Sequence, residues 1–426
     1  METVWNVGAT GLFLFAAVYL ALRWLGMSGI SLPGPFSDPL PEREETFVTH
    51  DTLYTVFFTA VIFRVAVAAG SFLLYGILSG GTIDVWELPS LWVRWDGTHY
   101  VKLVELGYGG YVENGQNLFL VFFPLYVWIV RAVRLLIPNT ALAGMLVSFL
   151  CFGGGSVYLY ALTAGEYGER KARRTLALLW AFPFSFFFGG IMTESLFFLT
   201  TTAGLYHIRK HQWRRASIWG IAAALTRMQG VILIGAAIAE LVNWKKPFSK
   251  QGTERWKVLA EILRKLPLLC TPVLGSLGYL ALNYHVTGDP FAFLTMQKHW
   301  SQGFMWFPKV LTYLWRNALS WYNPVVRWEL WVPEVILFPL FAWLLWKSRK
   351  KHRSMFVLYA FVYFTLNYCL SWLLSAGRYL SCGVPFFLFG AEELEGHPKW
   401  TAALIVVMGF LQCVLLYRYF CWGQVM

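Results

Sequence analysis

Long apolar blocks are the feature that most constrains how this chain can fold. Residues 55–75, 118–130 and 404–417 are examples that carry almost no charge. The longest is near the roughly 20 residues that a helix needs to cross a bilayer, and the others continue into apolar flanks. Only 14% of the 426 residues are charged, against about 25% in an average soluble domain. The sequence therefore predicts an all-α polytopic membrane protein, with roughly 10–14 crossings at one per 20 apolar residues.

The basic residues predict how the chain is threaded. Net charge is +12, and Lys and Arg cluster at residues 169–174, 209–215, 245–265 and 347–353. Such clusters mark cytoplasmic loops in a membrane protein, and none resembles a nucleic-acid-reading module. With each cluster inside, residues 28–52 lie in the cytoplasm, and 79–117 and 284–330 form two long outer loops. The N-terminus has no basic run before its first apolar stretch, which favours a retained first span over a cleaved signal peptide.

Two apolar segments, 176–207 and 217–244, have basic clusters at both ends, so each is expected to leave and re-enter the cytoplasmic face. Each has a polar break near its middle, at 189–194 and 226–230. Irregular backbone at membrane depth is tolerated where it is buried in protein or lines a cavity. Both breaks are therefore expected to face one cavity that opens outward. The course of 118–163 is left open, and the glycines at 153–155 are a further candidate break.

The most polar stretch of the first outer loop reads Arg94-Trp95-Asp96-Gly97-Thr98-His99-Tyr100. A carboxylate at a membrane edge could take a proton from an attacking hydroxyl, and aromatic rings could stack on a sugar. The alternative is an ordinary aspartate that caps the N-terminus of a short helix. The six cysteines have neither metal-ligand nor CxxC spacing and are expected to be packing residues.

This stretch, followed by Gly107-Tyr108 and by residues 122–126, resembles the signature of the PIG-V family of mannosyltransferases. These are GT-C-type enzymes of the glycosylphosphatidylinositol pathway with many bacterial relatives. Residues 193–197, 225–230, 288–300 and 377–379 resemble later family motifs in the same order. Two departures are Met228-Gln229, where the family has Ser-Asn, and residues 1–52, which look like an added first span and linker.

The resemblance implies one transmembrane catalytic domain over 1–426, a GT-C-like helix bundle whose active site faces outward, with 79–117 as the catalytic loop. It implies an inverting transferase that moves a sugar, mannose by analogy, from a polyprenyl- or dolichyl-phosphate carrier to a hydroxyl of a glycolipid or glycan. The match to bacterial relatives favours a bacterial plasma membrane. No cofactor is expected, although a divalent ion is left open.

By residue-by-residue carry-over, Asp96 is the general base that accepts the proton of the acceptor hydroxyl. Arg227 and Arg378 are expected to bind the leaving phosphate, because a guanidinium fork pairs with phosphate oxygens. The full set of expected substrate-binding residues is Arg94, His99, Tyr100, Glu194, Arg227, Gln229, Arg378 and Tyr379.

Several alternatives remain at this point. Glu194 could cap a half-helix, and His99 could orient Asp96 by a hydrogen bond. Arg227 and Arg378 could merely neutralise Glu194 or Asp289. Arg64, within the second span, would be paired or would extend to the interface. A lipid or solute transporter would share buried charges, but the two matching halves of repeat-built transporters are not found. An inactive relative is opposed by the presence of Asp96, Glu194, Arg227 and Arg378.

Overall fold

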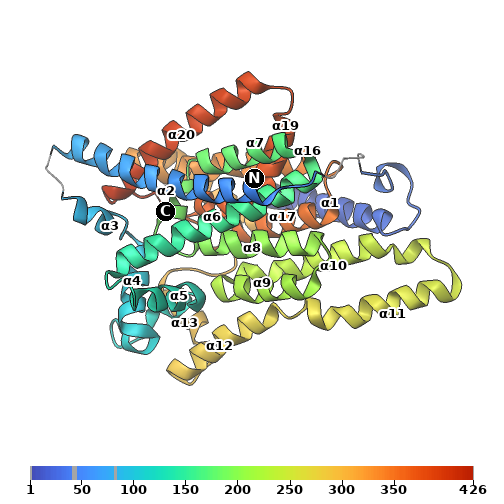
Figure 1. The fold of residues 1–426 in the computed structure, drawn as a ribbon, viewed down its shortest axis with the longest axis horizontal. Coiled ribbons are helices and arrows are strands. Elements are labelled where there is room, and N and C mark those ends of the chain that lie inside the picture. The colour runs from blue at the N-terminus through green and yellow to red at the C-terminus, as the bar shows by residue number, and fades with distance from the viewer. Residues whose placement is uncertain (1, 41–45, 81–83, 426) are drawn as a thin grey trace.

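The computed structural model describes residues 2–40, 46–80 and 84–425 and shows an all-helical protein (Figure 1). Residues 41–45 of the predicted cytoplasmic linker and 81–83 of the first outer loop lie outside the described residues. Within the described ranges no strand is present, and the helices are α1 (Glu2–Met27), α2 (His50–Ser79), α3 (Leu88–Leu91), α4 (Asp96–Gly110), α5 (Pro124–Arg134), α6 (Thr140–Tyr167), α7 (Glu169–Ala181), α8 (Glu194–Arg209), α9 (Trp213–Thr226), α10 (Ile232–Lys245), α11 (Gly252–Leu269), α12 (Val273–Thr287), α13 (Ala292–His299), α14 (Phe307–Ser320), α15 (Pro324–Val326), α16 (Val332–Ser348), α17 (Ser354–Asn367), α18 (Ala376–Ser381), α19 (Val384–Glu393) and α20 (Pro398–Phe420).

Six segments of the described chain are long and apolar enough to cross a membrane. They are α1, α2, α6, α20, the joined pair α11–α12 and the joined pair α15–α16. The protein is therefore an integral membrane protein, as its composition predicts. The helices α7 to α10 are only 13 to 16 residues long and pack on α6 or on one another. The expected total of 10–14 crossings stays a prediction.

The two expected breaks are confirmed. A 3-10 turn at Ser185–Gly189 separates α7 from α8. A second 3-10 turn at Met228–Val231 separates α9 from α10. In both cases a short helix runs away from a basic cluster and the next helix returns toward one, which is the course that the charge pattern predicts.

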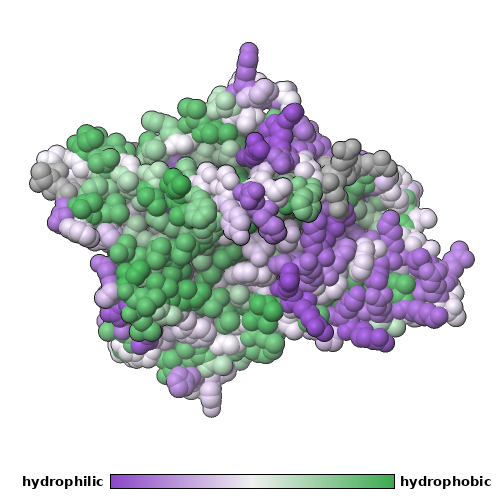
Figure 2. Space-filling view, viewed as in Figure 1, coloured by the Kyte–Doolittle hydropathy of each residue, from purple (hydrophilic) through white to green (hydrophobic). Residues whose placement is uncertain are grey.

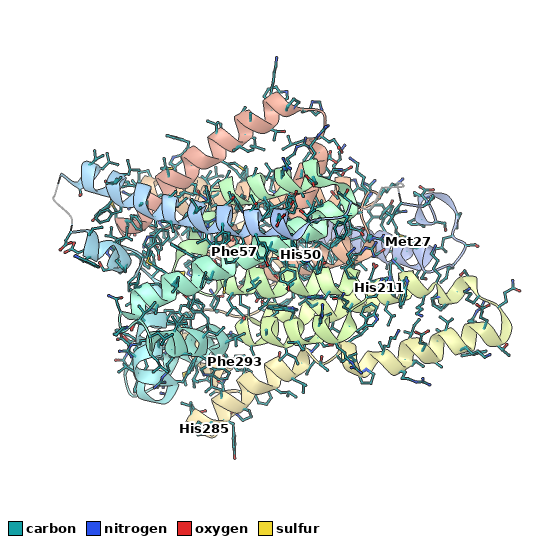
Figure 3. The ribbon with its side chains drawn as sticks, viewed as in Figure 1. Met27, His50, Phe57, His211, His285 and Phe293 are labelled. Atoms are coloured by element: carbon teal, nitrogen blue, oxygen red, sulfur yellow. The ribbon has the colours of Figure 1, made fainter. Side chains whose placement is uncertain are left out.

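The glycines at 153–155 do not break a helix, and that expectation is wrong. They lie inside the continuous helix α6. A Cβ atom on Gly153 would lie 2.8 Å from the Phe57 ring of α2, and one on Gly155 would collide with the Phe198 ring of α8. Phe57, labelled in Figure 3, lies in the first third of α2. These glycines therefore allow close helix–helix packing, as small residues do in membrane proteins.

The hydrophilic end of the molecule and the end that carries α3 and α4 are separated. The linker after α1 and the α10–α11 connection lie at one end of the long axis, and α3, α4 and α13 lie at the other (Figure 1). Hydrophilic side chains gather at the linker end, while apolar ones cover much of the remaining surface in view (Figure 2). Arg209 and Arg353, from two of the basic clusters, share ion pairs with Glu166 at 2.5 and 2.7 Å. These two basic clusters thus lie together, as a common cytoplasmic face predicts.

Arg64 in α2 is neither paired with an acid nor extended to the interface. Its side chain is buried, Nη1 donates to the Ser185 carbonyl at 2.8 Å, and the guanidinium lies 3.8 Å from the Phe152 ring centroid. The expectation of a pair or an interfacial position is therefore wrong. A carbonyl and an aromatic face replace them because α2 packs on α6 beside the first break, where backbone oxygens are freed from helical bonding.

Candidate active site

Asp96 lies at the start of α4 and faces an arginine. The N-cap residue of α4 is Trp95, and Asp96 is the first helical residue. Its Oδ2 accepts a hydrogen bond from Nη1 of Arg378 at 2.5 Å, and its side chain is 37% exposed. The alternative of an N-cap aspartate is therefore wrong, and the carboxylate remains accessible to a reacting molecule.

Glu194 is the buried centre of the same network. Its Oε1 accepts hydrogen bonds from Nε of Arg378 and from Nη2 of Arg227. Its Oε2 is buried and has no hydrogen-bond partner among the described residues. The N-cap of α8 is Thr193, and no side-chain cap is made there, so the half-helix cap alternative is also wrong. Asp96, Glu194, Arg227 and Arg378 thus form one continuous ion-pair network.

The breaks in the helices bring these side chains together. Glu194 opens α8 directly after the first break. Arg227 has an extended backbone, φ −156° and ψ 149°, between α9 and the second break. Arg378 lies on the six-residue helix α18, and Gly377 beside it packs so closely on the Phe184 ring that a Cβ atom would collide. A continuous helix at either break would carry these residues away from each other.

Aromatic rings and one hydroxyl hold the arginines. The Arg378 guanidinium lies 5.3 Å from the Phe187 ring centroid, and that of Arg227 lies 5.7 Å from the Tyr379 ring. The Nε of Arg227 also donates to Oγ1 of Thr193 at 2.8 Å. Such rings exclude water and strengthen the electrostatic interactions inside the site.

His99 and Tyr100 flank Asp96 without contacting it by a hydrogen bond. Nδ1 of His99 pairs with the Tyr111 hydroxyl at 2.9 Å, and the imidazole stacks on Phe119 at a centroid distance of 4.1 Å. The hydrogen-bond orienter alternative for His99 is therefore wrong. Burial lowers the pKa of His99. Tyr100 is buried and packs edge-to-face on Phe122 at 4.8 Å.

The remaining candidates take different positions. Gln229 is half-buried in the 3-10 turn that follows Arg227. Arg94 points to the C-terminal helix, where its Nε donates to the Phe420 carbonyl at 3.1 Å. Asp289 does not neutralise either arginine, because its Oδ1 accepts from the Phe291 N–H within its own turn at 2.8 Å.

Sequence reasoning missed two parts of this site. Thr193 was noted only as part of a motif, although its hydroxyl fixes Arg227. After α20 the sequence pattern predicts only that Cys421 is a packing residue, yet Gly423 accepts a hydrogen bond from Trp95 at 3.2 Å. No local signal marks either residue, since both contacts depend on tertiary packing.

Over the described ranges no group of three or more His, Cys, Asp or Glu side chains could hold a metal ion.

The fold and this network define a class: an integral membrane protein with a carboxylate and guanidinium site at the end opposite its basic clusters. No family model and no curated protein matches the sequence. Among solved structures, the chain is similar to the crystal structure of ArnT from Cupriavidus metallidurans bound to undecaprenyl phosphate. The similarity has a TM-score of 0.49 and 14% sequence identity, and covers 85% of this chain and 76% of that chain. Membership of the PIG-V family stays a prediction from the sequence motifs.

Proposed function

We propose that this protein is an inverting GT-C-type glycosyltransferase, with a polyprenyl- or dolichyl-phosphate sugar as donor and a glycolipid or glycan hydroxyl as acceptor. The observation that carries the proposal is the Asp96–Arg378–Glu194–Arg227 network. It combines an accessible base with two cations that suit a phosphate leaving group. Mannose as the sugar, and the extracytoplasmic face of a bacterial plasma membrane as the location, are the further parts of the proposal.

In the proposed reaction, Asp96 takes the proton of the acceptor hydroxyl as its oxygen forms a bond to the anomeric carbon. The bond from that carbon to the phosphate oxygen breaks, and its electron pair stays on the phosphate. The phosphate monoanion thereby becomes a dianion. Transition-state charge of this kind is stabilised best by preorganised donors in a water-excluded site.

The Arg378 contact couples these two charge changes. Two arginines and two carboxylates balance formally in the resting network. When Asp96 accepts a proton, its negative charge is lost and Arg378 no longer has a full counter-charge there. The network gains one positive charge as the phosphate gains one negative charge. A guanidinium has five N–H donors, so each arginine keeps donors beyond the contacts described here.

The donor is proposed to be lipid-linked because the site belongs to a membrane-embedded bundle. The chain has no glycine-rich phosphate loop, and the site lies at the opposite end from the basic clusters. A transporter remains the second candidate function, but no observation in the structure favours it over a transferase.

The test is sugar transfer by the detergent-purified protein. Undecaprenyl-phosphate mannose, labelled in the sugar, is incubated with cell-envelope extract as the acceptor source. We expect label to move from the lipid-phosphate fraction into glycolipid or glycan. GDP-mannose should give no transfer in a preparation free of lipid carrier. Efficient transfer from GDP-mannose under that condition would contradict the proposal. After reconstitution into proteoliposomes, movement of intact donor between the leaflets without sugar transfer would favour the transporter.

A further inference from the structure

The five residues that follow α20 fold back on the catalytic loop, and we refer to Cys421–Val425 as the C-terminal hook. Trp422 has a positive φ of 59°, and the Gly423 N–H donates to the Arg418 carbonyl at 2.7 Å. A side chain at Gly423 would not fit, because its Cβ atom would lie 2.8 Å from that carbonyl oxygen. Val425 is fully buried. The hook is therefore a specific turn and not a loose end.

The hook contacts the two residues that precede Asp96. Nε1 of Trp95 donates to the Gly423 carbonyl at 3.2 Å. The Trp422 and Trp95 rings meet edge-on with their centroids 5.8 Å apart. The Arg94 guanidinium lies 4.8 Å from the centroid of the Trp422 ring. In Figure 1 the C-terminus lies near α4, at the end of the molecule that carries the catalytic loop.

The contacted backbone is strained. The Gly97 N–H donates to the Arg94 carbonyl at 2.8 Å, so residues 94–97 form a tight turn with Trp95 and Asp96 at its centre. Trp95 has φ 49° and ψ −126°, close to the first central position of a type II′ turn, which glycine normally occupies. A residue with a bulky side chain is strained in this conformation, which persists only when the surroundings hold it.

The hook is anchored on its other side by the start of the α15–α16 segment, one of the six that are long and apolar enough to cross a membrane. Glu329, in the π-helical turn Arg327–Trp331, forms an ion pair with Arg418 of α20. Its Oε2 also accepts from the Gln424 N–H at 3.3 Å. The hook thus connects the first outer loop to the start of the α15–α16 segment through backbone and side-chain contacts.

We propose that the C-terminal hook is a positioning element for the transferase reaction: Trp422 and Gly423 hold Trp95 in its strained turn, so that the adjacent Asp96 faces Arg378. The activity part of this inference rests on the proposed function. The structural part does not, and it can be measured separately.

The experiment compares Trp95→Phe and Trp422→Ala with wild type in the full chain. Trp95→Phe keeps an aromatic ring and removes the donor to Gly423. Trp422 is 52% exposed, so its loss removes little buried core. Trp86→Phe is the matched control, because Trp86 lies in the same loop and is 83% exposed. Amide hydrogen exchange over residues 94–99 and transfer kinetics are recorded for each protein.

The Trp95→Phe and Trp422→Ala proteins are both expected to exchange faster than wild type at the Gly97 and Thr98 amides. They should lose kcat by about 10- to 100-fold, as misplacement of a reacting group does, with KM for the lipid donor little changed. The control should match wild type in both measurements. Unchanged exchange would overturn the inference, as would faster exchange with normal kcat or a defect confined to KM. If wild type shows no transfer at all, the proposed function fails while the exchange result still decides whether the hook holds the turn.

Discussion

At the scale of single residues, Arg378 is the side chain on which the proposed chemistry depends most. It donates from Nη1 to Asp96 and from Nε to Glu194, two directions that a planar guanidinium satisfies together. Lysine keeps the charge but has one compact ammonium group. Arg378→Lys should therefore lower kcat by about 10²-fold or more, the loss seen when one preorganised donor is removed.

The measurement for Arg378→Lys is the transfer rate beside a thermal melt. Arg173→Lys is the matched control, because Arg173 is 73% exposed and pairs with Glu169 on the surface. Near wild-type turnover in Arg378→Lys would show that Arg378 acts only as a neutralising charge. That outcome would favour the alternative in which the arginines only neutralise Glu194, with which both are paired.

His99 gives the protein a pH dependence that can be isolated. Burial lowers its pKa in the folded protein below the ordinary value of about 6.5. As the pH falls, His99 takes up a proton in the unfolded chain before it does so in the folded protein, and this favours unfolding. The contribution of the neutral imidazole to folding stability is therefore fully present above about pH 6.5 and is lost as the pH falls toward the folded pKa. Wild type should therefore lose more melting temperature between about pH 8 and about pH 5 than His99→Gln does. Equal slopes for the two proteins would contradict a buried neutral imidazole.

The sequence predicts which residues belong to the candidate site better than it predicts which of them contact one another. The motif order marked Asp96, Glu194, Arg227 and Arg378, and the structure places all four in one network. Their catalytic roles stay predictions. The cap alternatives for Asp96 and Glu194 were wrong because capping depends on whether a residue precedes or begins the helix, a one-residue distinction that sequence patterns rarely resolve. The contact of Thr193 with Arg227 depends on two distant breaks and had no sequence signal.

At the scale of elements, the glycines of α6 determine how closely its neighbours approach. Gly155 faces the Phe198 ring, which is completely buried, and a Cβ atom at position 155 would collide with that ring. Gly155→Ala should therefore destabilise the protein by about 1–3 kcal/mol, as overpacking of a core usually does. Gly70→Ala in α2 is the control, since a Cβ atom there meets nothing within 4 Å, and it should be neutral or slightly stabilising because alanine favours helices.

The measurement is a thermal melt of the Gly155→Ala and Gly70→Ala proteins in the same detergent as wild type. A Gly155→Ala protein that melts with wild type would mean that α6 and α8 are not in tight contact at this level.

The elements themselves differ in how well sequence could predict them. The breaks at 189–194 and 226–230 were predicted because polar residues interrupt apolar runs that basic clusters enclose. The glycines at 153–155 gave the same local signal but form continuous helix. The difference is tertiary: glycine is tolerated inside a helix when a neighbouring side chain occupies the space that a Cβ atom would take.

At the scale of the whole molecule, the account predicts opposite sides of the membrane for the catalytic loop and the basic clusters. Glu113→Cys lies in the catalytic loop and Gln251→Cys lies between α10 and α11, and both side chains are exposed. A membrane-impermeant maleimide applied to intact cells should label the Glu113 variant and leave the Gln251 variant at the wild-type background. The reverse pattern would place the site in the cytoplasm and remove the argument for a lipid-linked donor.

The large-scale arrangement followed from charge and hydropathy because both are set by the bilayer and not by local packing. The two ends of the molecule and the out-and-back course of α7 to α10 were expected on those grounds. The hook of residues 421–425 was not, because its contacts join a chain end to a loop more than 300 residues away, and no local pattern records such a contact.

The most direct test of the central claim is Asp96→Asn. Asparagine keeps the shape and can still accept a hydrogen bond, but it cannot take up a proton at neutral pH. The side chain is 37% exposed, so the melting temperature and donor binding should change little. Transfer should fall by at least the roughly 10²–10⁴-fold that general-base assistance contributes. Transfer at a near wild-type rate by a normally melting Asp96→Asn protein would contradict the account and move the base elsewhere, with Glu194 the next candidate.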